Sequence, residues 1–87
     1  MKKDYEVFIG PFSAHAYSDY ELFDLFRVAK ESGMITAEKA EEAIGLAAGL
    51  ISSDKSTMRA WSNISIHNRA LEDELRRKHY SENRETA

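Results

Sequence analysis

The stretch from Ala43 to Ile51 is nine residues long and contains no polar side chain. On a helix, nine residues make about two and a half turns, so this run predicts a helix that has no polar face there. Such a helix has to be covered on more than one side. Thr36 is a good N-cap ahead of the run, and polar residues from Ser52 onward break the pattern. These limits place the helix at 36–52.

A second helix is predicted over 18–32. Ser18 and Glu21 have the spacing of a capping box, in which the Ser18 hydroxyl accepts from the Glu21 amide and the Glu21 carboxylate accepts from the Ser18 amide. Gly33 follows the helix and can adopt the left-handed conformation that ends many helices. The expected buried stripe consists of four residues: Leu22, Leu25, Phe26 and Ala29.

A third helix is predicted over 57–80 because apolar residues recur there at helical spacing. The seam is Trp61, Ile64, Asn68, Leu71 and Leu75, in which Asn68 is a polar member of the kind that fixes register between paired helices. Trp61 is expected to anchor the core. After Leu71 the charges are ordered as three acids, Leu75 and three bases, which is typical of a solvated helix. The tail, 81–87, is expected to fray.

Only the segment 4–12 resembles a strand. Tyr5, Val7 and Ile9 alternate with other residues, and Gly10 with the following proline ends the run. A single strand is not stable alone, and the rest of the sequence shows no second one. We therefore expect an extended arm over 1–17 that lies on the chain's own helices, pairs with its copy in an oligomer or adds to a partner's sheet.

Together these elements predict an all-α fold, a three-helix bundle with an extended N-terminal arm, formed by one domain over 1–87. A chain of this length has a thin core, so a homodimer is expected. Gly45-x-x-x-Gly49 would let a second helix approach closely, either within one chain or between two. The residues predicted for self-association are Gly45, Leu46, Gly49, Leu50, Ile64, Asn68, Leu71 and Leu75.

Charge and composition restrict the classes of function. The 15 acidic and 12 basic residues give a formal charge of −3, which argues against a nucleic-acid-binding domain. The longest apolar run is half of what a membrane span needs, and no signal peptide precedes it, so we expect a soluble cytoplasmic protein. There is no cysteine, and no histidine pair has metal-ligand spacing with a carboxylate partner. We therefore expect no cofactor, no metal and no enzymatic activity.

The leading hypothesis is a small regulatory or adaptor protein that binds another protein, of the kind that mobile elements encode as inhibitors. An acidic band could face a basic partner, and it consists of Glu21, Asp24, Glu38, Glu41 and Glu42. Two alternatives are a dimeric DNA-binding regulator and a structural subunit of a larger assembly. Ala29-x-x-x-Gly33 resembles the centre of a DNA-binding helix-turn-helix, but the pattern needs apolar residues where this chain has Lys39 and Glu42.

Overall fold

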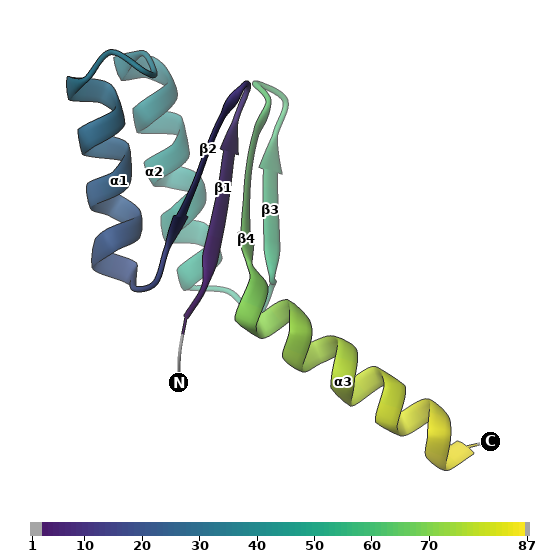
Figure 1. Ribbon diagram of the computed structural model, residues 1–87. Helices are drawn as coiled ribbons and strands as arrows, with labels where there is room; N and C mark the ends of the chain where they lie inside the picture. Colours follow the sequence, from purple (N-terminus) through teal and green to yellow (C-terminus); the bar gives the residue numbers. More distant parts are fainter. Residues whose placement is uncertain (1–2, 87) are drawn as a thin grey trace.

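The computed structural model describes residues 3–86, and the side chains of residues 3–79. The fold is α+β, with an antiparallel four-stranded sheet of order β2-β1-β4-β3 (Figure 1). The predicted all-α helical bundle is therefore wrong. In chain order the elements are β1 (Tyr5–Ile9), β2 (Phe12–Ala16), α1 (Asp19–Glu31), α2 (Ala37–Ile51), β3 (Thr57–Ala60), β4 (Ile64–Asn68) and α3 (Arg69–Thr86).

The first two predicted helices are confirmed, together with their caps. The Ser18 hydroxyl accepts from the Glu21 amide at 3.0 Å, and Thr36 caps α2 in the same way. The Glu21 carboxylate, however, accepts from the backbone N–H of Tyr17 rather than from that of Ser18. Gly33 has φ 77°, the left-handed conformation that the sequence predicted for it.

The N-terminal segment is a hairpin in the sheet and not an extended arm. Gly10 has φ 59° and stands first in the two-residue turn that it forms with Pro11, which fits the type II′ turn of tight hairpins. The following strand, FSAHA, alternates small or aromatic residues with polar ones. The strand β1 lies between β2 and β4, so its second partner is a segment from the far part of the chain. Its other partner, β2, follows β1 directly in the sequence.

The predicted third helix is wrong over its first half, where the chain forms the β3–β4 hairpin. Ile64 and Ile66 alternate with polar residues and are buried, as period-two alternation requires. Asn63 has φ 64° and ends a three-residue turn, the arrangement that usually produces a bulge in such hairpins. Trp61 lies in this turn with its side chain fully exposed, so it does not anchor the core.

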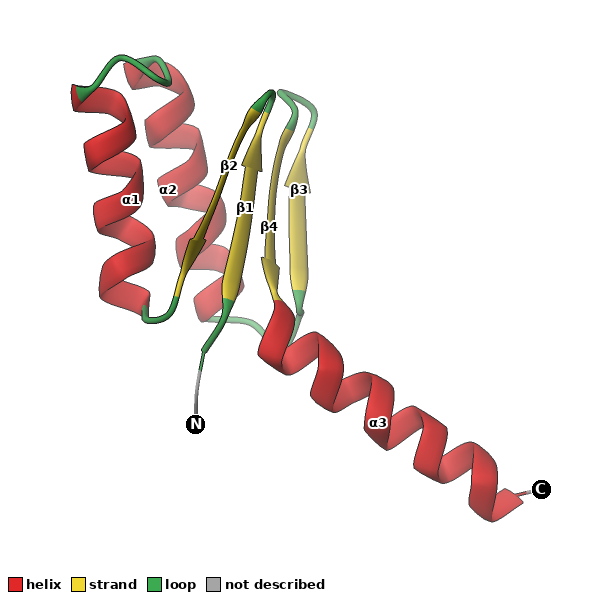
Figure 2. Cartoon of the chain, in the orientation of Figure 1, coloured by secondary structure: helices red, strands yellow, loops and turns green. Residues whose placement is uncertain are grey.

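The core lies between one face of the sheet and the helices α1 and α2, which form an antiparallel pair on that face (Figure 2). Val7, Ile66 and Phe26 are each 0% exposed. Burying aromatic and branched side chains between two layers is the main stabilising contribution in a domain of this size. The core also contains the alanines of one side of α2, which lets this helix approach the sheet closely.

The apolar helix α2 does have a solvent-exposed side, contrary to the sequence prediction. The exposed residues on this side include Ile44, Gly45 and Ala48. Two of these residues have little or no apolar side chain to bury, so leaving them in water costs little free energy. The prediction counted apolar residue types and ignored their size.

The last helix, α3, begins directly after β4 and projects away from the rest of the molecule (Figure 1). Asn68 caps its start, because its side-chain Oδ1 accepts from the backbone N–H of Leu71 at 3.2 Å. The backbone is helical to Thr86, beyond the predicted end at residue 80 and through the segment expected to fray. The molecule is consequently elongated, at 51 × 26 × 21 Å. Among the described residues, no helix has both the length and the apolar character needed to cross a bilayer.

Candidate functional site

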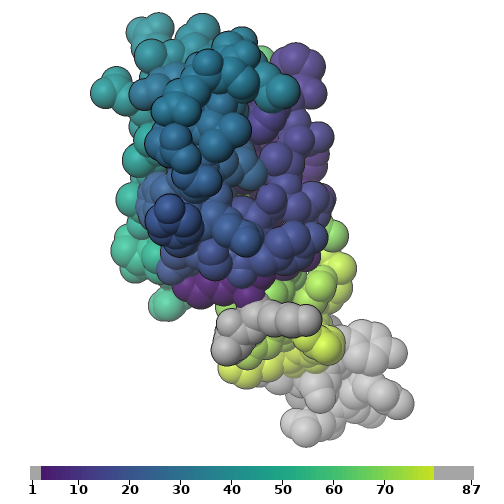
Figure 3. All heavy atoms as spheres, turned by 60° about the vertical axis from the view of Figure 1, so that its left-hand side comes forward, coloured from purple at the N-terminus to yellow at the C-terminus, as the bar shows by residue number. Residues whose placement is uncertain are grey.

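A groove runs between the edge strand β2 and the helix α1. Figure 3 shows the molecule from the side on which α1 lies next to this strand. The groove has a volume of about 430 Å³, and we call it the β2–α1 groove. Its lining comes from the two elements and from the link after α1: Phe12, His15, Glu21, Asp24, Leu25, Val28, Ala29 and Met34.

The strand β2 forms one edge of the sheet, so one side of its backbone has no neighbouring strand. In an antiparallel pair of strands, directly opposed residues alternate. One pair of residues exchanges backbone hydrogen bonds, and the next pair directs its N–H and C=O groups away from the partner strand. The tight turn closes on the pair Ile9–Phe12, so the pairs that include Ser13 and His15 are of the second kind. The N–H and C=O groups of Ser13 and His15 are therefore directed to the free edge, beside the groove.

Acidic groups dominate the charge at this groove. Two of its lining residues are carboxylates, Glu21 and Asp24, and none is a lysine or an arginine. One oxygen of Glu21 accepts from the Tyr17 amide at 2.7 Å, and Oδ1 of Asp24 accepts from Arg27 at 2.6 Å. Each carboxylate has a second oxygen that can accept a further hydrogen bond. His15 lies at the border, with Nδ1 3.1 Å from Oδ1 of Asp4.

The face of the sheet that the helices leave uncovered is mostly polar. Glu6 lies between His15 on β2 and His67 on β4, because both histidines are its register partners. His15 Nε2 approaches the Glu6 carboxylate to 3.4 Å, and the His67 ring makes an edge-to-face contact with Phe8. Arg69, at the start of α3, lies 4.0 Å from the same carboxylate. This face can form hydrogen bonds, and Glu6 does not line any of the three main cavities of the described residues.

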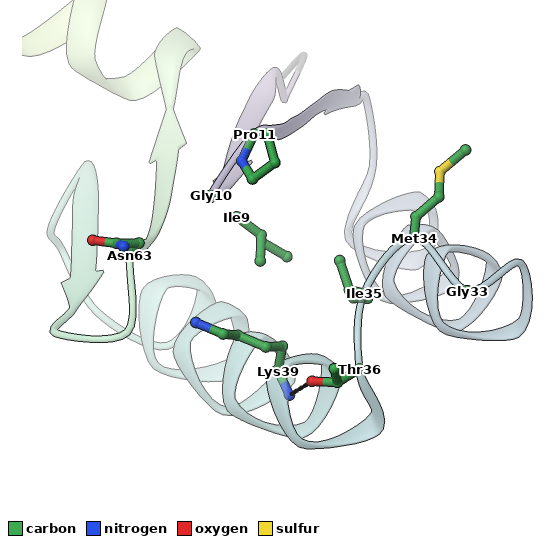
Figure 4. A pocket seen from close by; sticks show the side chains of 9 residues that line it. All are labelled: Ile9, Gly10, Pro11, Gly33, Met34, Ile35, Thr36, Lys39 and Asn63. Carbon is green, nitrogen blue, oxygen red and sulfur yellow. Dashed lines mark hydrogen bonds between the residues drawn. The ribbon is translucent and has the colours of Figure 1, made fainter.

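A second cavity of about 330 Å³ opens at the end of the molecule where both hairpin turns meet the α1–α2 link (Figure 4). Ile9, Pro11 and Ile35 make it largely apolar, and Lys39 is its one charged lining residue. The Lys39 ammonium donates to the backbone carbonyl of Ser62, so this cation serves to hold the β3–β4 turn against α2. The cavity lies beside exposed Met34, but nothing in its lining selects a ligand.

At the opposite end, a small polar cluster ties the first strand to α1. Asp19 accepts from Lys3 Nζ at 2.8 Å and from the Tyr5 hydroxyl at 2.6 Å. The hydrogen bond from Lys3, followed by that from Tyr5, lowers the pKa of the Asp19 carboxyl below its usual value. Burial, and then the hydrogen bond to Asp19, raises the pKa of the Tyr5 hydroxyl. The groups are complementary and the cluster is structural.

The residues predicted for self-association do not form one surface. On α2, Gly45 has open space around it, whereas a Cβ added at Gly49 would lie 3.2 Å from the Met58 side chain of its own chain. The other predicted residues of α2, Leu46 and Leu50, pack on the core. The third-helix seam is divided: Ile64 is buried in the sheet, Asn68 ends β4, and Leu71 and Leu75 lie on α3.

The predicted acidic band is also divided. Glu21 and Asp24 lie on the first half of α1, while Glu38, Glu41 and Glu42 lie on the first half of α2. Since the two helices are antiparallel, these halves are at opposite ends of the molecule (Figure 1). The sequence analysis did not find the apolar lining of the β2–α1 groove. The alternation of FSAHA after a Gly-Pro turn was the signal for it.

Within residues 3–86 the side chains described form no group of three or more His, Cys, Asp or Glu residues that could hold a metal ion. Comparison with family models, with curated proteins and with solved structures produced no match. The surfaces of this chain are therefore the only guide to its function.

Proposed function

We propose that the protein is a small, non-enzymatic protein-binding module that acts as a homodimer joined through α3. One observation supports this most directly. The helix α3 leaves the rest of the molecule after its first turn, and its residue Leu75 is 44% exposed. An 18-residue helix without packing along most of its length is marginal in water, because helices depend on tertiary contacts for most of their stability.

The sequence of α3 is complementary to itself in the antiparallel direction. Three acids, Glu72 to Glu74, precede Leu75, and three bases, Arg76 to Lys78, follow it. If two copies cross at Leu75 in opposite directions, each acidic half lies against the basic half of the partner. A parallel arrangement would place like charges together, and it would also align the two helix dipoles unfavourably.

Helical geometry decides which of these charges would lie closest to the contact. Leu71 is one turn before Leu75 and shares its face, while Glu72 and Lys78 flank Leu75 on either side of that face. In the antiparallel pair, Glu72 of each copy would lie at the same height along the helix axes as Lys78 of the other, and this would occur twice. Two leucines from each chain and two such ion pairs, in which Lys78 is exposed and Glu72 is partly buried, give a weak contact, since an ion pair near the surface contributes about 0.2–1 kcal/mol.

A charge exchange tests the dimer. The measurement is solution mass by light scattering after gel filtration, over a range of protein concentrations and at low salt. We expect Lys78→Glu to shift the wild-type dimer toward monomer, because the new glutamate of each copy then lies at the height of Glu72 of the other, where the two like charges repel. Glu72→Lys should act in the same direction. The double variant with both substitutions should recover the dimer.

The double variant also serves as the control, since it retains the composition of the chain. Recovery would separate a contact between copies from a loss of helix stability, which the two single changes could also cause. A wild-type monomer at every concentration would overturn the proposal. So would a dimer that neither single substitution weakens.

The proposal retains two expectations from the sequence: that the module is regulatory or an adaptor, and that it acts in the cytoplasm. The description as an inhibitor encoded by a mobile element stays a prediction from size and charge.

A further inference from the structure

The two edges of the sheet differ in how they are protected. Unpaired edge strands tend to recruit other strands, and proteins commonly prevent this with charged side chains, prolines or very short strands. The edge strand β3 has four residues and carries exposed Arg59. The edge strand β2 has five residues, FSAHA, with no proline, lysine or arginine among them. Of the two edges, β2 is the one suited to accept a further strand.

The β2–α1 groove offers exposed apolar surface on which the side chains of such a strand could pack. Val28 is 49% exposed and Met34 is 66% exposed, and both line the β2–α1 groove. A strand added about 4.8 Å from β2 would direct alternate side chains toward α1, where Leu25 and Val28 supply apolar surface. Its remaining side chains would lie beside Ser13 and His15 on the open face of the sheet.

We propose that the β2–α1 groove binds an extended segment of another protein, which adds to β2 as a fifth strand and carries a basic residue toward Glu21 and Asp24. Strand addition obtains its affinity from backbone hydrogen bonds and its selectivity from pockets for alternate side chains. Here the backbone groups are those of Ser13 and His15, and the pocket is the apolar side of α1. This binding site is separate from α3 and goes beyond the proposed dimer.

The charge of the groove decides the nature of the occupant. Glu21 and Asp24 are the two carboxylates of its lining, which contains no lysine or arginine, so a segment that carries lysine or arginine complements it. The β2 strand of a second copy would complement it less well, because FSAHA contains only His15 as a basic residue. A segment whose α1-facing side chains, at every second position, include both apolar and basic residues fits the apolar and the acidic parts of the groove.

The probe is a synthetic seven-residue peptide, capped at both ends, in which threonine occupies every second position and the positions between hold two lysines and two valines, so that lysine and valine share one face of the strand. The matched peptide has glutamate in place of lysine. Binding is followed by the backbone amide shifts of the full-length protein in NMR titrations. We expect the lysine peptide to shift the amides of Ser13 and His15 to saturation, and the glutamate peptide to bind at least about tenfold more weakly. Equal binding of both peptides would contradict the role given to Glu21 and Asp24.

The matched variants are Ser13→Pro and Ser13→Ala. Proline removes only the outward N–H, and edge strands tolerate it where that group faces solvent. We expect Ser13→Pro to weaken the lysine peptide at least about tenfold and Ser13→Ala to change it less than about twofold, since alanine retains the N–H. If Ser13→Pro fails to fold, as judged by its unfolding curve, Val28→Asn tests the apolar side of the same groove without adding a charge, and it should also weaken binding at least about tenfold.

Two results would overturn the proposal. The first is unchanged peptide binding in Ser13→Pro or in Val28→Asn. The second is a wild-type dimer that Ser13→Pro converts to monomer while neither peptide binds, because β2 would then pair with its own copy. Repeating the titration on Lys78→Glu separates the two proposals. Binding there should equal that of the wild type, whether or not α3 forms a dimer.

Discussion

The sheet with its two covering helices and the projecting helix α3 are stabilised in different ways. In the first region, residues distant in sequence bury one another: Tyr5 is a register partner of Asn68 and is 1% exposed. In α3, the described contacts are mostly local, such as the ion pairs of Arg76 with Glu72 and Asp73. Exposed ion pairs contribute far less than burial. This difference is the reason for proposing that α3 depends on a partner.

The largest expected difference between the two regions appears when one large side chain is removed from each. Phe26→Ala leaves a cavity between α1 and the sheet, so we expect it to lower the free energy of unfolding by about 3–5 kcal/mol. Leu75→Ala removes an exposed side chain and should change that free energy by less than about 0.5 kcal/mol in dilute solution. Urea unfolding followed by circular dichroism measures both. Equal losses would mean that α3 packs on the rest of the chain.

A smaller effect distinguishes packing from local helix propensity within α2. Gly45→Ala adds a methyl group into open space and should raise the free energy of unfolding by up to about 1 kcal/mol. Gly49→Ala makes the same chemical change 3.2 Å from the Met58 side chain, which must move to admit it. We expect a clearly smaller gain or a loss there. If both variants gain equally in thermal unfolding, Gly49 does not make the close contact described.

The smallest effect concerns the ion pair of Lys3 with Asp19 in the packed region, in which Asp19 also accepts from the hydroxyl of buried Tyr5. The pKa of Asp19 is lowered in the folded protein, so its contribution to stability is present above the unfolded value of about 4 and is lost as the pH falls through the folded value. We expect Asp19→Asn to lower the melting temperature at pH 7 and to leave it nearly unchanged at the acidic end of that window. A constant difference between the variants across this range would contradict the assignment.

Local sequence signals predicted the first two helices, α1 and α2, well because their determinants lie within a few residues. Ser18 and Thr36 accept from amides three residues on, and Gly33 takes the left-handed conformation. None of these features needs a distant partner. The same kind of reasoning failed over 57–68, where Trp61 and Ile64 also fit a helical period, and alternation over so few residues could not exclude it.

The candidate site was predicted only in part. Glu21 and Asp24 were expected to face a partner, and the structure places both at the β2–α1 groove. Phe12 and Val28, which lie in different elements, come together only because β2 folds back on β1 and α1 then covers the same side of the sheet. A pattern along the chain does not contain that juxtaposition.

By itself the sequence determined the helices α1 and α2, their caps and the strand character of the first segment, since hydrogen-bonding side chains and glycine act on their immediate neighbours. The tertiary structure alone decided that this strand lies at the centre of a sheet, with β4 as its second neighbour. A strand can pair with a segment that is distant in the sequence, as β1 does with β4. The free energy that selects this pairing comes from burying Val7 and Ile66 together under the helices.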